Sequence, residues 1–95
     1  MKNSEWIGKT VVVRNSGAGV LFGIVVRKTR GGITLKDGGK VFSWEGALCV
    51  EAIASAGITG GRLVPFELQT IRADAGEQVL LATDEAMAKL RAAAR

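Results

Sequence analysis

The residues best suited to chemistry lie in one short stretch, R-N-S-G-A-G-V-L-F-G, at residues 14–23. Residues that tolerate positive φ can curl successive backbone N–H groups toward one point, which makes a nest for phosphate or carboxylate. Arg14 stands beside this nest as a charge-assisted donor. The sequence therefore predicts an anion site formed by Arg14, Ser16, Gly17, Ala18 and Gly19. The alternative is an ordinary hairpin connection in which two of the glycines only relieve backbone strain.

The stretch matches neither of two common phosphate-binding patterns. It lacks the GxxxxGK[ST] of a P-loop, and its G-A-G precedes a β-prone run rather than a helix, unlike a dinucleotide-binding fingerprint. Phe22 and Trp44 can stack a flat ring, although each is also an ordinary core residue. Basic residues border the expected hairpin ends, where most are solvated edge charges and one or two can contact a ligand: Arg14, Arg27, Lys28, Arg30, Lys36 and Lys40.

The composition excludes several kinds of catalytic site. The chain has no histidine, no tyrosine and one cysteine, Cys49. It therefore cannot assemble a Cys/His zinc site, a Ser-His-Asp triad or a histidine acid/base pair. The only adjacent acids, Asp84 and Glu85, stand where a helix is expected to begin, and we interpret them as helix-capping charges. We expect a protein that is not an enzyme and that has no metal or cofactor.

The hydrophobic pattern predicts one domain, residues 1–95, with strands and helices in α+β order. β-Branched or alternating runs indicate about six strands, at 10–14, 20–28, 33–36, 41–44, 63–72 and 79–82. Asp37-Gly38 predicts a tight turn between the third and fourth of them. Helical spacing at 46–57, ended by Gly57, predicts a crossing helix, and Thr83 is the expected N-cap of a helix over 84–94. We expect a curved antiparallel sheet or partial β-barrel.

Charge and hydropathy indicate the kinds of partner to expect. Of the net charge of +4, residues 1–48 carry +5 and residues 49–95 carry −1, which permits phosphate-bearing partners. Nucleic acid is a less favoured partner, because there is no run of like charge. No apolar run is long enough to cross a membrane, and the 47% hydrophobic content of so short a chain suggests a homo-oligomer. The lone cysteine and the polar start predict a cytoplasmic protein.

Three segments together resemble a family of small, uncharacterised phage and prophage proteins. They are V-x-V-R-x-x-G-A-G-V-x-F-G at 11–23, the W-x-G-A segment that runs from Trp44 to Gly57, and T-D-E-A at 83–86. The resemblance covers most of the chain in order. The family pattern has an arginine pair and further aromatics before the tryptophan, where this chain has G-K-V-F-S at 39–43. Stacking and guanidinium contacts are therefore not expected from that strand.

Small phage proteins of this architecture look similar to the oligomeric sponges that sequester nucleotide immune signals, such as the Thoeris and CBASS anti-defence proteins. The resemblance implies that Arg14 and the amides of 16–19 hold phosphate, that Lys40 adds charge, and that Phe22 or Trp44 stacks a base. We expect a non-enzymatic phage protein that binds and sequesters a small anionic ligand, such as a cyclic nucleotide. The alternatives are a nucleic-acid-binding small β-barrel and a structural or protein-interaction component that uses the helix at 84–94.

Overall fold

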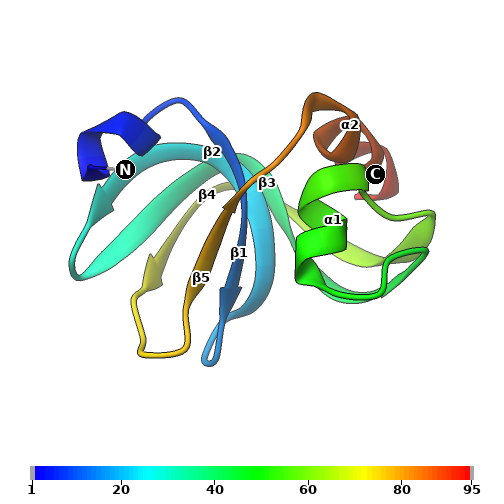
Figure 1. The fold of residues 1–95 in the computed structure, drawn as a ribbon, viewed down its shortest axis with the longest axis horizontal. Helices are drawn as coiled ribbons and strands as arrows, with labels where there is room; N and C mark the ends of the chain where they lie inside the picture. The colour runs from blue at the N-terminus through cyan, green and yellow to red at the C-terminus, as the bar shows by residue number, and fades with distance from the viewer. Residues whose placement is uncertain (1, 95) are drawn as a thin grey trace.

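Residues 2–94 of the chain are described by a computed structural model. Within them the chain forms a five-stranded sheet, two α-helices and a short 3-10 helix (Figure 1). In chain order the elements are η1 (Asn3–Trp6), β1 (Thr10–Asn15), β2 (Gly19–Thr29), β3 (Gly32–Glu45), α1 (Val50–Ala56), β4 (Gly60–Arg72), β5 (Gln78–Leu81) and α2 (Asp84–Ala93).

The five strands are antiparallel and lie in the order β4-β3-β2-β1-β5. β1 to β4 form a meander, with α1 inserted between β3 and β4. The chain then returns to place β5 on the free side of β1, where Val11–Arg14 pair with Gln78–Leu81. The sheet is strongly curved, and β4 and β5 are its edges (Figure 1). The expected α+β class with a curved antiparallel sheet is confirmed, with five strands in place of about six.

The expected tight turn at Asp37-Gly38 is wrong, because β3 runs through it as one strand. The turn that joins β2 to β3 lies at residues 30–31, between the strands expected at 20–28 and 33–36. Asp37 has a φ of 52°, and the β2–β3 register shifts between Phe22 and Ile24, so both strands bend here. A Cβ on Gly38 would collide with the carbonyl oxygen of Phe22. The glycine therefore serves a close approach of two bent strands, and the two strands expected at 33–36 and 41–44 are one.

The core is divided by β1, whose valines are buried on both faces of the sheet. Val11, Val12 and Val13 are each 0% exposed. Because side chains alternate along a strand, Val12 faces one side and its two neighbours face the other. Val12 belongs to a first core cluster that includes residues of both α-helices, and Val11 and Val13 belong to a second cluster formed by strand residues alone. This two-sided burial explains why β1 reads as an unbroken apolar run rather than an alternating one.

Both helices pack on the same face, at one end of the sheet (Figure 1). α1 ends at Gly57, whose φ of 82° suits a residue without a side chain, as expected. The Thr83 hydroxyl accepts a hydrogen bond from the amide of Ala86 and caps α2, also as expected. Leu90 is 0% exposed, so α2 docks on its own chain. Within residues 2–94, no helix is long and apolar enough to span a membrane.

Candidate functional site

The turn between β1 and β2 is organised around one buried polar side chain, Asn15, which is 4% exposed. Its amide nitrogen donates to the carbonyl oxygen of Arg72 at 2.8 Å and to Oε1 of Glu77 at 3.1 Å. Its amide oxygen accepts from the backbone N–H groups of Gly17 at 3.0 Å and of Ala18 at 2.9 Å. Asn15 therefore joins the turn to the segment that connects β4 with β5.

A carboxylate of the same chain occupies the remaining donors of this turn. Oδ2 of Asp74 accepts from the amide of Ser16 at 2.8 Å and, more weakly, from the amide of Gly17 at 3.4 Å. Its other oxygen lies 3.4 Å from the Ser16 hydroxyl and accepts from the amide of Gly76 at 2.9 Å. The curled amides do hold an anion, but that anion is internal. The expectation that they are free to bind an external ligand is therefore wrong.

The other two residues of the expected anion site lie beside the turn without contributing to a cradle. Arg14 is exposed, and strand alternation places it on the face opposite Asn15. Its guanidinium therefore points away from the side chain that organises the turn. Gly19 opens β2 with a φ of 89°, which is the strain-relieving role of the hairpin alternative. The β1–β2 turn therefore has a structural role, because it is bonded to the segment that connects β4 with β5.

The two aromatic residues that sequence reasoning named for stacking have structural roles. Phe22 is 0% exposed in the first core cluster, so the expectation that it stacks a ligand is wrong. Trp44 is half-buried and packs against the same cluster. Its indole N–H donates to the carbonyl oxygen of Ala47 at 3.1 Å, which ties the end of β3 to the loop before α1.

Lys40, by contrast, lies next to an exposed aromatic ring. Its Nζ is 5.2 Å from the centroid of Phe42, within the range of a cation–π contact. Phe42 is 59% exposed. The β3–β4 register shifts between Val41 and Ser43, so Phe42 is the extra residue of a β-bulge. Bulges re-aim side chains and are common beside functional sites, and this one turns a large apolar ring toward solvent.

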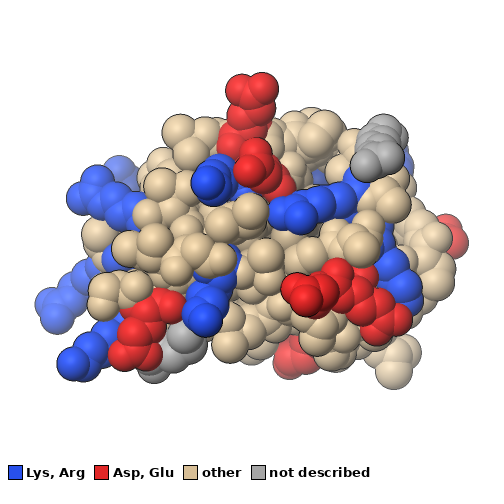
Figure 2. Space-filling view, turned by 90° about the horizontal axis from the view of Figure 1, so that it is seen from above, with Lys and Arg blue, Asp and Glu red and all other residues tan. Residues whose placement is uncertain are grey.

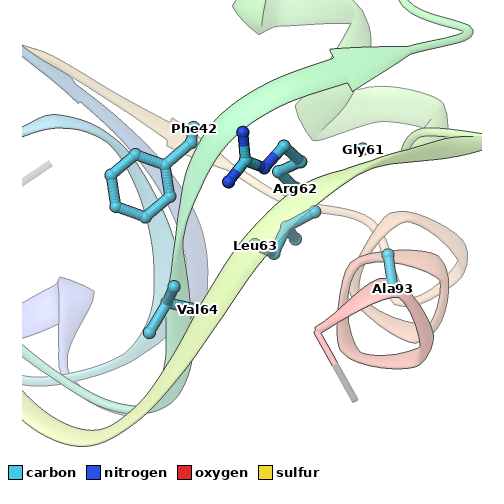
Figure 3. A pocket seen from close by; sticks show the side chains of 6 residues that line it. All are labelled: Phe42, Gly61, Arg62, Leu63, Val64 and Ala93. Carbon is cyan, nitrogen blue, oxygen red and sulfur yellow. The ribbon is translucent and has the colours of Figure 1, made fainter.

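The Phe42 ring forms one wall of a hollow on the described surface, which we call the Phe42 groove. The groove has a volume of about 620 Å³, and its lining comes from β3, β4 and α2: Phe42, Gly61, Arg62, Leu63, Val64 and Ala93. Figure 3 shows the Arg62 guanidinium extending from β4 toward the side of the groove that carries Phe42. A second hollow of about 390 Å³ adjoins it and shares Gly61 and Ala93. The two together make a trough along the edge of the sheet, beside α2.

The charges at the Phe42 groove are positive, and no acidic side chain of residues 2–94 forms an ion pair with them. Among residues 2–94 the only ion pair within 4.0 Å joins Lys89 to Glu85 on α2. Lys40 and Arg62 therefore keep their charges available to a ligand. A planar ring can stack on Phe42 while an anionic group on the same ligand meets the two cations. Within the described residues, no group of three or more His, Cys, Asp or Glu side chains is placed to hold a metal ion.

Sequence reasoning named Lys40 but missed Phe42 and Arg62. It assigned 41–44 to a strand that follows a turn, and strand alternation alone does not reveal a bulge at Phe42. The resemblance to the phage and prophage family gave no expectation of stacking at residues 39–43, because the chain departs from the family pattern there. An available signal was the run Lys40-Val41-Phe42, which sets a cation two positions from an aromatic side chain, on the same face of a strand.

The comparisons with known proteins give a family and no activity. A family model described as a domain of unknown function, DUF6948, matches residues 8–90. The chain therefore belongs to the DUF6948 family. The comparison with curated proteins and the comparison with solved structures each found no match.

Proposed function

We propose that this member of the DUF6948 family binds a small anionic ligand that carries a flat ring, of the nucleotide class, and holds it without transforming it. The observation that carries the proposal is the exposed Phe42 ring, aimed outward by a bulge and flanked by Lys40 and Arg62. The proposed site is the Phe42 groove and not the turn between β1 and β2.

The physical properties of the groove suit such a ligand. Its volume of about 620 Å³ lies within the roughly 300–1,000 Å³ range of small-molecule sites. Stacking of a base on an aromatic side chain contributes about 1–3 kcal/mol. The planar guanidinium of Arg62 can donate two hydrogen bonds to one phosphate, and Leu63 and Val64 supply apolar surface beside it.

Retention of an immune signal is the biological role we propose for this binding. The resemblance to phage anti-defence sponges supports a cyclic nucleotide as the first ligand to test. A protein that sequesters a ligand depends on its affinity for that ligand and on its own concentration, and it needs no catalytic group. If the protein holds the ligand without transforming it, ligand recovered after denaturation of the protein should have an unchanged mass.

The proposal is tested by calorimetric titration with four kinds of probe: cyclic mononucleotides, cyclic dinucleotides, adenosine and inorganic phosphate. We expect at least one cyclic nucleotide to bind more tightly than either adenosine, which lacks the charge, or phosphate, which lacks the ring. Phe42→Ala and Arg62→Ala should each weaken that binding about tenfold, which corresponds to about 1.4 kcal/mol. Mass spectrometry of the recovered ligand should show the same compound that was added.

Two other residues of β4, the edge strand that lines the groove, provide matched controls. Leu68 is 62% exposed and lies outside the groove, so Leu68→Ala removes an exposed apolar side chain from β4 and should leave the affinity unchanged. Arg72→Ala removes an exposed guanidinium from the end of the same strand. If no probe binds, or if the controls weaken binding as much as the groove variants, the proposed function is wrong.

The expected homo-oligomer stays a prediction. Light scattering coupled to size exclusion, with and without a ligand that binds, gives the number of chains per particle. A mass equal to one chain at micromolar concentration would contradict it.

A further inference from the structure

A second surface suited to phosphate groups lies on the sheet near the β2–β3 turn. Along β3 the side chains of Ile33 and Leu35 are buried in the second core cluster. Thr34 and Lys36 alternate with them and therefore point to the opposite face, toward solvent. Figure 1 shows that the β2–β3 turn and the two helices lie at opposite ends of the molecule. The helices therefore leave this part of the sheet uncovered.

Three strands contribute to this surface in register. Arg27 of β2 pairs with Thr34 of β3, which pairs with Thr70 of β4. In the next row on the same face, Thr29 pairs with Gly32 and Gly32 with Arg72. Lys36 follows two positions beyond Thr34. We call this set the threonine surface, which consists of Arg27, Thr29, Thr34, Lys36, Thr70 and Arg72.

The middle of the threonine surface is concave and rich in hydroxyl groups. A hollow of about 200 Å³ is lined by Arg27, Thr29, Gly31, Gly32, Thr34 and Thr70. The hydroxyl oxygens of Thr34 and Thr70 are 3.0 Å apart, so one of them donates to the other. Each hydroxyl carries one proton, so this contact leaves the second proton free to donate elsewhere. The hollow therefore combines a guanidinium with at least one available hydroxyl donor.

The cations of the threonine surface have no partner within the described chain. The only ion pair among residues 2–94 is on α2, so Arg27, Lys36 and Arg72 are unpaired there. Asp37 of β3 and Glu67 of β4 are the nearest acids along those two strands, and neither lines the hollow. Figure 2 shows Lys and Arg side chains projecting from the end of the molecule that carries the β2–β3 turn.

We propose that the threonine surface binds the phosphodiester backbone of a single-stranded nucleic acid. Successive rows on this face are separated by about 6.6 Å along the strands, and the three rows carry Arg72 on β4, Arg27 on β2 and Lys36 on β3. Because neighbouring strands are about 4.8 Å apart, Arg72 and Arg27 stand on either side of β3 and their long side chains can reach a nucleic-acid strand that follows β3. Successive phosphates of an extended single strand are separated by a similar distance. A strand laid along these rows meets one cation per nucleotide, with the hydroxyls between them. The Phe42 groove takes no part in this contact.

The test is fluorescence anisotropy with a labelled oligothymidylate of about 20 nucleotides at several salt concentrations. Three phosphate contacts on a single strand predict a slope of about −2 for the logarithm of affinity against the logarithm of salt. Affinity should then fall about 20-fold between about 50 and 200 mM salt. In the double variant Arg27→Ala/Arg72→Ala one contact remains, so the slope should be about −0.7 and the fall about threefold.

A second double variant tests whether binding depends on the residues of the threonine surface or only on the overall positive charge of the protein. Arg62→Ala/Arg91→Ala removes the same number of guanidiniums from β4 and α2, away from the threonine surface. It should keep the slope near −2. Thr34→Val/Thr70→Val removes both hydroxyls together, and it should weaken binding severalfold without changing the slope. Circular dichroism of each variant establishes that it is folded.

The outcomes distinguish this proposal from the proposed function of the groove. The Phe42→Ala variant should bind the oligonucleotide normally, and Arg27→Ala/Arg72→Ala should bind a cyclic nucleotide normally. No binding at about 50 mM salt, or equal loss in both arginine pairs, would overturn the threonine surface as a site. Equal affinity for a duplex of the same length would overturn the assignment to a single strand.

Discussion

Replacement of Asn15 by alanine should destabilise the protein more than any other change of one polar side chain at the β1–β2 turn. The side chain is 4% exposed and makes four hydrogen bonds, two as a donor and two as an acceptor. Its partners lie in the turn and in the β4–β5 connection. Alanine leaves two backbone amides, the Arg72 carbonyl oxygen and the Glu77 carboxylate without this partner.

The size of the effect follows from the number of bonds. A typical internal hydrogen bond contributes about 1 kcal/mol net. Four bonds therefore predict a loss of about 3–4 kcal/mol, allowing for partial rescue by water at the exposed amides of the turn. A domain of this size has a free energy of unfolding of about 5–14 kcal/mol. The midpoint of thermal unfolding should fall by about 12–32 °C.

Urea denaturation followed by circular dichroism measures the loss in free energy of unfolding. An unchanged m-value shows that the substitution has not altered the unfolded state. Asn3→Ala is the matched control, because Asn3 is exposed and its side chain accepts one long hydrogen bond within residues 2–94, from Nζ of Lys28 at 3.5 Å. It should change stability by less than about 0.5 kcal/mol. If Asn15→Ala lowers the free energy of unfolding by less than about 1 kcal/mol, the claim that this side chain holds the β1–β2 turn to the β4–β5 connection is wrong.

Three further changes test the fold at single positions. Gly38→Ala should cost about 3 kcal/mol or more in urea denaturation, because its Cβ would collide with the Phe22 carbonyl oxygen and the bent strands must separate. Gly8→Ala should cost only about 1–2 kcal/mol, because its φ is 84° but no atom lies within 4 Å of the added carbon; equal costs at both glycines would contradict this reasoning. Thr83→Ala should cost about 1 kcal/mol through loss of the α2 cap, and Thr83→Ser should restore most of it if the hydroxyl is responsible.

Local signals in the sequence were sufficient for the elements whose causes are local. The hydroxyl of Thr83 caps α2 from three residues away, and Gly57 ends α1 through its own backbone angle. The valine run of β1 predicted a strand for the same reason, because β-branched side chains favour extended backbone. These features were predicted correctly from neighbouring residues alone.

The errors arose where residues distant in sequence decide the outcome. Asp37-Gly38 has the composition of a tight turn, but its conformation is set by contact with Phe22 on another strand. The curled amides of Ser16 and Gly17 are suited to an anion, and the anion is Asp74, 58 positions from Ser16. Nothing local to the turn shows that the chain supplies its own carboxylate. The exposure of Phe42 likewise depends on a bulge that only the pairing of β3 with β4 defines.

The most direct test of the account is an NMR titration that follows every backbone amide as a cyclic nucleotide is added. Binding in the Phe42 groove predicts the largest chemical-shift changes at Phe42 and at residues 61–64, with a titration curve that weakens in Arg62→Ala. The amides of residues 16–18 should stay unchanged, because Asn15 and Asp74 already occupy them. Largest changes at residues 16–18, with Phe42 unaffected, would contradict the central claim.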